Sequence, residues 1–145
     1  DQALAEAAHM PWRPDAAKAL LLIADAPPHE KAMDATLDLT QSLRARGVQI
    51  VPVAASGVED SAQYVMRTMA VLTQGRYIFL TDDSGIGNAH AEPDISCYVV
   101  TRLDQLIARV LAGLVTGQRI EPGRAEIIRT VGDYDGGRCR TGAQN

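Results

Sequence analysis

Short apolar runs alternate with amphipathic stretches along most of the chain. Residues 18–24, 48–54 and 76–81 are runs of aliphatic, β-branched and aromatic side chains, the pattern of strands buried in a parallel sheet. Residues 31–46 and 60–74 place apolar side chains at intervals of three and four, as amphipathic helices do. The order strand, helix, strand, helix, strand follows from this pattern.

Glycine and proline refine these predictions. Gly47 and Gly75 directly follow the two predicted helices, where a glycine in the left-handed conformation commonly ends a helix. Pro52 has no N–H to donate to a ladder, which favours an edge or bulged position for its strand. A longer amphipathic helix is expected from about residue 95 to 115, covering one face of the sheet.

The last part of the chain has a different composition. Beyond Gly117 the sequence is polar and rich in glycine, with one short strand expected at 126–131 and a frayed end from 133. We therefore expect a domain over residues 1–117 and a polar C-terminal extension over 118–145.

Alternating strands and helices of this length predict right-handed crossovers, and hence an α/β fold with a parallel sheet and helices on both faces. Ligands of such sheets bind at the carboxyl ends of the strands. The loops at residues 25–30, 56–60 and 82–94 follow the three predicted strands. Their polar side chains are Asp25, His29, Glu30, Ser56, Glu59, Asp60, Asp82, Asp83, Ser84, His90, Glu92 and Asp94.

These loops are rich in oxygen and contain no sulfur, which favours a hard cation such as Mg²⁺, Mn²⁺ or Ca²⁺. Ordinary loop chemistry is the alternative, because Asp82 and Asp83 are typical of Asx-turns and the histidines are typical of solvated side chains. Asp25 differs from them, since it directly follows a run of aliphatic residues where an unpaired carboxylate is costly.

Composition excludes some classes of function. The chain has 145 residues, 46% of them hydrophobic, and a formal net charge of −4, so it suits one globular domain and offers no basic groove for nucleic acid. No apolar run is long enough to span a bilayer. Cys97 and Cys139 lack the spacing of zinc ligands; two free thiols are preferred, and one disulfide stays open.

Several stretches resemble the second half of a von Willebrand factor type A (vWA) domain of bacterial type. They read WRPDAAKALLLIADAPPH, RGVQIVPVAASG and MRTMAVLTQGRYIFLTDDSG. The resemblance implies a doubly wound sheet of strand order 3-2-1-4-5-6, in which the three predicted strands are the fourth, fifth and sixth. It also implies that Asp25 matches the aspartate after the fourth strand, which belongs to the metal-ion-dependent adhesion site (MIDAS) of the family.

The other ligands of that site have no counterpart here, because the chain contains no Asp-x-Ser-x-Ser motif. Either this branch has lost the metal site, or the chain is a C-terminal fragment. In the second case the missing half supplies the motif and the divalent cation. Asp1 opens the chain within a helical pattern, which favours the fragment. The strand at 18–24 then has an exposed edge. We expect the N-terminal half of the domain, or another chain, against it.

The resemblance implies a protein-binding or adhesion module rather than an enzyme. Its partner would meet the carboxyl edge of the sheet, with Asp25 as a metal ligand and His29, Ser56, Asp82 and Asp83 in partner-facing loops. The alternative is a metal-dependent hydrolase or phosphoryl-transfer domain that uses Asp25 with His29 or His90. A purely structural domain is a third reading. An exported location is favoured by the bacterial resemblance, although nothing in the chain is a sorting signal.

Overall fold

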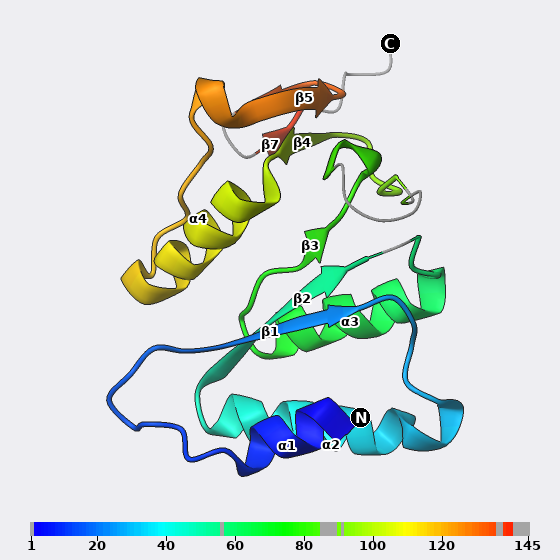
Figure 1. Ribbon diagram of the computed structural model, residues 1–145, viewed down its shortest axis with the longest axis vertical. Coiled ribbons are helices and arrows are strands. Elements are labelled where there is room, and N and C mark those ends of the chain that lie inside the picture. The colour runs from blue at the N-terminus through cyan, green and yellow to red at the C-terminus, as the bar shows by residue number, and fades with distance from the viewer. Residues whose placement is uncertain (1, 56, 85–89, 91, 136–137, 141–145) are drawn as a thin grey trace. The chain divides into compact units, whose positions relative to one another are not determined.

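The computed structural model describes residues 2–55, 57–84, 90, 92–135 and 138–140. It divides the chain into two compact units, Asp1–Phe79 and Leu80–Asn145, which we call the sheet unit and the disulfide unit and describe one at a time. Figure 1 labels their helices and strands.

In the described part of the sheet unit, three parallel strands form one sheet in the order β1-β2-β3. β1 (Lys18–Ala24) and β2 (Val48–Ala54) have the predicted bounds, whereas β3 (Ile78–Phe79) is shorter than the predicted 76–81. β1 pairs with β2 along its whole length, and β3 pairs only with the last two residues of β2. The sheet therefore has one long edge strand and one very short one.

The helices of the sheet unit all pack on one face of this sheet (Figure 1). They are α1 (Gln2–His9), α2 (Met33–Ala45) and α3 (Asp60–Leu72), and the short 3₁₀-helix η1 (Glu30–Ala32) leads into α2. Their apolar stripes meet alternate residues of the strands, which point to the same side of the sheet. One buried cluster consists of Leu4, Ala7, Leu43, Val48, Ile50, Val65 and Met69, and a second consists of Ala54, Val58, Ala62 and Met66.

The loop between α1 and β1 is held by hydrogen bonds to the end of α1. Trp12 packs against the core, and its Nε1 donates to the carbonyl of Ala7 at 2.7 Å. The Arg46 guanidinium donates to the carbonyls of Ala8 and, at 2.9 Å, Met10. Because these carbonyls have no partner within the helix, Arg46 and Trp12 fix α1 against the end of α2.

Pro52 lies in the middle strand, so the expected edge or bulged position is wrong. Amides along a strand point alternately to its two sides. The N–H of Ala55 donates to Ala24 of β1 at 3.1 Å, whereas the N–H of Ile50 donates away from β1. The nitrogen of Pro52 therefore also faces away from β1, on the side where β3 pairs only with Val53 and Ala54. The missing N–H removes no bond of the β1–β2 ladder.

The turn after α3 takes the place of a neighbouring strand beside Ile50. The buried Thr73 hydroxyl accepts the N–H of Ile50 at 2.9 Å and donates to the carbonyl of Met69 at 2.8 Å.

Gln74, not Gly75, adopts the left-handed conformation, with φ of 56°, so the expectation for Gly75 is wrong. Gly75 is needed because a Cβ there would overlap the carbonyl oxygen of Ile50. Gly47, with φ of 72°, does end α2 as predicted.

The disulfide unit contains β4 (Tyr98–Thr101), α4 (Leu103–Thr116), the 3₁₀-helices η2 (Asp82–Ser84) and η3 (Arg124–Glu126), and β5 (Ile127–Val131). The helix predicted from 95 to 115 is thus wrong in its first part, where β4 pairs antiparallel with β5. The β-branched valines of β4 happen to continue the apolar spacing of α4, so periodicity could not separate the two elements. The short strand predicted at 126–131 is confirmed as β5.

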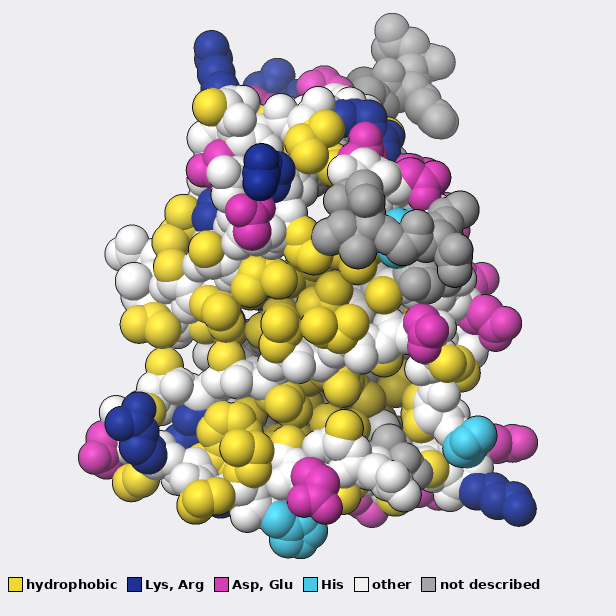
Figure 2. Space-filling model, in the orientation of Figure 1, with side chains coloured by type: hydrophobic (Ala, Val, Ile, Leu, Met, Phe, Trp, Pro, Cys, Tyr) yellow, Lys and Arg dark blue, Asp and Glu magenta, His cyan; other side chains and the backbone are white. Residues whose placement is uncertain are grey.

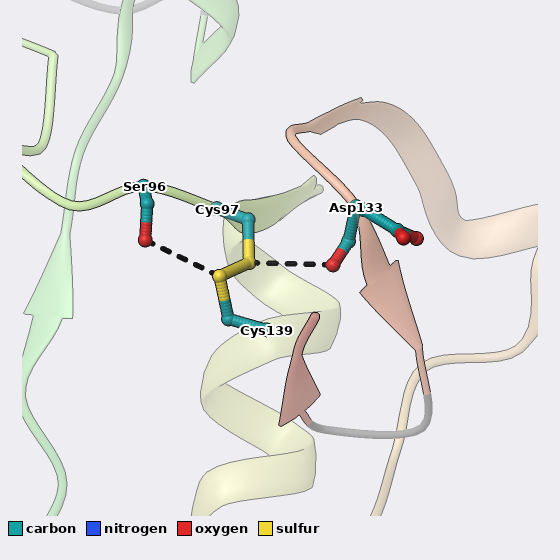
Figure 3. Close-up of a disulfide and its surroundings, with 4 residues drawn as sticks. All are labelled: Ser96, Cys97, Asp133 and Cys139. Atoms are coloured by element: carbon teal, nitrogen blue, oxygen red, sulfur yellow. Dashed lines mark hydrogen bonds between the residues drawn. A yellow bond between two sulfur atoms is a disulfide. The ribbon is translucent and has the colours of Figure 1, made fainter. Parts of the chain in front are cut away.

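A hairpin and a disulfide follow, where we expected a frayed end. β6 (Tyr134–Asp135) pairs with β7 (Arg138–Cys139), and Cys139 is bonded to Cys97 with a Cα–Cα distance of 5.7 Å (Figure 3). The preference for free thiols is therefore wrong. The Ser96 hydroxyl donates to Cys139 Sγ at 3.3 Å, and the carbonyl oxygen of Asp133 lies 3.5 Å from Cys97 Sγ.

The architecture is α/β, with a three-stranded parallel sheet and small antiparallel sheets over the described residues. The complete doubly wound sheet, its helices on both faces and the division at residue 117 stay predictions. Within the described part of the chain, no helix has the length and hydropathy needed to cross a membrane.

Candidate functional site

The three strands of the sheet unit end in register at one edge of the sheet. Ala24 of β1 pairs with Ala54 of β2, and Ala54 pairs with Phe79 of β3. The loop of residues 25–29 and the segment after Ala54 therefore leave the sheet side by side, as predicted for the carboxyl edge. Ser56, one of the predicted site residues, lies outside the described residues.

Asp25 is exposed directly after β1 and makes no hydrogen bond or ion pair with any residue that the structure describes. Because Asp25 is exposed where the strand ends, its charge is accessible to solvent, and its role as a metal ligand stays a prediction. Pro27 and Pro28 restrict the backbone of the loop. His29 ends it with an exposed ring, and its carbonyl accepts the N–H of Ala32 at 2.7 Å where η1 begins.

A cavity of about 240 Å³ lies beneath this loop, on the helix side of the sheet. Its walls come from α1, the end of β1, the loop itself, α2 and α3. His29 and Pro28 stand at the loop side, and Leu4, Ala62 and Met69 lie on the helices. Thr36 of α2 also lines it; this residue is fully buried, and its hydroxyl has no hydrogen-bond partner among the described residues.

Asp82 and Asp83 belong to the disulfide unit, where they hold the local structure together. Asp82 accepts the backbone N–H of His90 at 2.6 Å. Asp83 Oδ2 accepts from Arg129 Nη2 at 2.7 Å and Nε at 3.1 Å, and from the Thr81 hydroxyl at 3.1 Å. Both carboxylates therefore have the structural role that loop chemistry suggested, in addition to any contact with a partner.

Arg129 organises this cluster from the middle of β5. Its Nη2 also donates to Glu92 at 3.0 Å, and the guanidinium carbon lies 5.8 Å from the centre of the Tyr98 ring. The Tyr98 hydroxyl in turn donates to Glu92. One cation thus balances two carboxylates and stacks on an aromatic ring, which leaves Asp83 poorly suited to bind a second cation.

The ion pair determines how Asp83 titrates. The hydrogen bonds from Arg129 lower the pKa of the Asp83 carboxyl below its ordinary value. Because this pKa is lower in the folded than in the unfolded state, the ion pair stabilises the fold at any pH above the unfolded-state pKa of Asp83. That stabilisation is lost as the pH falls through the folded-state pKa of the same carboxyl.

We expect Arg129→Gln to raise the pKa of Asp83 toward its ordinary value, because the largest cause of the shift is removed. Carboxyl ¹³C chemical shifts followed between pH 7 and pH 2 measure this directly. Arg124→Gln, which removes the same charge elsewhere in the unit, should leave the titration of Asp83 unchanged. An equal shift in both variants would show that general charge, not this pair, sets the pKa.

The described residues do not fit a cation site by themselves. No group of three or more His, Cys, Asp or Glu side chains among them could hold a metal ion. Asp25 is a single carboxylate, and hard cations need several oxygen ligands. A cation at Asp25 would therefore require ligands from outside the described residues, and its presence stays a prediction.

Two residues of interest were missed by the sequence analysis. Thr36 lies on an apolar helix face where a threonine methyl packs as well as a valine, so nothing in the pattern marks its unpartnered hydroxyl. Arg129 interrupts a strand whose other residues are all β-branched, and that interruption was the available signal. Comparison with protein-family models, with curated proteins and with solved structures finds no match to this chain.

Proposed function

We propose that the chain is a protein-binding module of vWA type, in which a strand of another polypeptide segment pairs with β1 and meets the loop of residues 25–29. The observation that carries this proposal is the edge position of β1 in the described sheet, together with its exposed aliphatic side chains.

Among the residues that the structure describes, no strand pairs with the outer side of β1, which leaves a long edge of unpaired backbone groups. Ala24 uses its carbonyl toward β2, since it accepts the N–H of Ala55. Because backbone groups alternate between the two sides of a strand, Ala19, Leu21 and Ile23 direct theirs toward the free edge. Unpaired N–H and C=O groups in this arrangement are a template for another strand.

The side chains of the same residues are also exposed. Leu21 is 37% exposed and Ile23 is 65% exposed, and both lie on the sheet face opposite α1, α2 and α3. In Figure 2, where β1 lies at the front, apolar side chains reach the surface around this strand. Fully burying one such side chain contributes about 1.5–3 kcal/mol, so a partner strand and its own side chains would gain a substantial apolar contact.

The strand leads directly into the exposed loop. A strand paired with β1 has to pass Asp25, which carries a solvated charge and no partner among the described residues, and then His29. These two side chains are placed to distinguish between partners, because charge complementarity at the end of an apolar contact selects register and orientation. A divalent cation binds at Asp25 only if the partner supplies further ligands.

The resemblance to the vWA family supports the same edge. It assigns β1, β2 and β3 to the fourth, fifth and sixth strands, which are parallel and adjacent in that order, as these three are. In that arrangement the fourth strand has a parallel neighbour on its other side, and the free edge of β1 is the matching position.

We expect the isolated chain to associate through this edge when no other partner is present. Ile23→Lys should weaken association at least about tenfold, since a lysine on an edge strand opposes pairing. Sedimentation velocity over a range of concentrations measures the change. Val71→Lys is the matched control, because Val71 is 77% exposed on α3 and receives the same charge. A monodisperse monomer with a cooperative melt, or equal effects of both variants, would contradict the proposal.

A further inference from the structure

The cavity beneath the loop of residues 25–29 combines a buried floor with a reachable rim. On the floor, Ala62 is 1% and Leu4 is 2% exposed, and neither carries a polar side-chain atom. At the rim, Ala3, Ala26 and His29 are exposed residues. The cavity is therefore open at the loop and closed beneath by buried side chains.

Thr36 places one polar group in this apolar space. The residue is fully buried, and its Oγ1 has no hydrogen-bond partner among the described residues. Thr40, one turn further along α2, is also buried but donates its hydroxyl to the carbonyl of Thr36 at 2.8 Å. Buried hydroxyls are normally satisfied in this way. Thr36 is thus the one fully buried polar side chain of the described cavity lining, and its hydroxyl has no partner among the described residues.

Water is a poor occupant of the cavity. A buried water is held by two to four polar groups, whereas the floor side chains other than Thr36 are aliphatic or methionine. An ion is also disfavoured, since His29 at the rim is the one titratable side chain of the described lining and a charge on the floor would have no partner. The lining thus favours an uncharged, mainly apolar molecule.

The volume sets the size of that molecule. An engineered cavity of about 150 Å³ in another protein binds benzene, and drug-sized ligands use about 300–1,000 Å³. At about 240 Å³, this cavity has room for a bicyclic ring system or an alkyl chain of similar bulk. We infer that it is a binding site for a small, uncharged, predominantly apolar molecule whose single hydrogen-bonding group pairs with the Thr36 hydroxyl.

The floor of this site uses none of the β1 side chains that the partner strand would cover, although both sites meet the loop of residues 25–29. The cavity lies on the helix face of the sheet, between β1 and the helices, whereas Leu21 and Ile23 lie on the opposite face. Loss of association in Ile23→Lys therefore says nothing about the cavity, and the variants below leave the exposed side chains of the β1 edge unchanged.

Indole and indene test the inference as a matched pair of probes. They have nearly the same shape, but only indole has an N–H that can donate to Thr36 Oγ1. We expect indole to bind at least about tenfold more tightly than indene, measured by saturable amide shifts of residues in α2 and α3 in ¹⁵N-resolved NMR titrations. In Thr36→Val, which keeps the shape and removes the hydroxyl, the ratio of the two affinities should fall to about one.

Filling the cavity should remove binding of both probes. Ala62→Leu places three additional carbon atoms on the floor, and Ala45→Leu, the same change at an exposed position of α2, is its control. Ala3→Phe covers the mouth from an exposed position, so it keeps the test valid even if Ala62→Leu fails to fold. Three results would overturn the inference: no saturable shift with either probe, wild-type affinity in both cavity variants, or an unchanged affinity ratio in Thr36→Val.

Discussion

Gly75→Ala is expected to destabilise the sheet unit by about 3–5 kcal/mol, a large part of the stability of a typical domain. The new Cβ would overlap the carbonyl oxygen of Ile50 and lie 2.7 Å from its carbonyl carbon. Backbone atoms of a central strand cannot move aside as the end of a flexible side chain can. To relieve the overlap, the turn after α3 must move away from β2 and break the bond between Ile50 N–H and Thr73 Oγ1.

Thermal unfolding followed by tryptophan fluorescence measures this effect. Trp12 is the chain's single tryptophan and packs against the core of the sheet unit, so its emission reports on that unit. A loss of 3 kcal/mol or more should lower the melting temperature by more than about 12 °C.

Gly47→Ala is the matched control, because it tests backbone conformation without a steric overlap. Gly47 has φ of 72°, and the nearest atom to an added Cβ is the end of the Lys18 side chain at 3.9 Å. The expected cost is about 1–2 kcal/mol, that of holding an alanine in the left-handed region. If Gly75→Ala were no more harmful than Gly47→Ala, the close approach of Gly75 to β2 would be wrong.

Removal of the disulfide is expected to destabilise the other unit by a similar amount. Cys97 and Cys139 are separated by 42 residues, and closing a loop of that length in the unfolded chain corresponds to about 4 kcal/mol in the chain-entropy model. The bridge also joins the segment that precedes β4 to the hairpin that ends the described chain. Few other contacts of comparable strength fix that hairpin, since β6 and β7 have two residues each.

The double variant Cys97→Ser, Cys139→Ser tests this by hydrogen exchange. Protection of the paired amides in β4 and β5 should fall by up to about a thousandfold. Ser96→Ala is the control, because it removes the hydrogen bond to Cys139 Sγ and keeps the bridge. It should change protection by less than about threefold. Equal protection in the double variant and the wild type would show that the antiparallel sheet does not depend on the bridge.

Local patterns predicted the sheet unit well because its elements are defined by neighbours in the sequence. The apolar runs at 18–24 and 48–54 became β1 and β2 without a change of bounds, and Gly47 ended α2 in the predicted conformation. Gly75 was predicted in the right place for the wrong reason, since its role depends on Ile50, which lies 25 residues earlier and touches it only in the folded chain.

The disulfide unit was predicted less well because its defining contacts join distant residues. Tyr98–Thr101 becomes a strand through pairing with Ile127–Val131, and nothing within the segment itself distinguishes it from the start of α4. The same is true of Asp83, whose partner Arg129 is 46 positions away. In the site, Asp25 and His29 were found from their position after a strand, whereas the cavity at Thr36 depends on how three helices pack.

The two unequal edges of the parallel sheet set a limit on the size of any assembly that it forms. β1 presents seven residues, but β3 presents two, and the turn at Thr73 already occupies the side of β2 that a longer β3 would cover. Head-to-tail growth into a filament needs two competent edges on each molecule. With one competent edge, association stops after a single pairing step. The product is either a two-fold dimer or a complex with one partner strand.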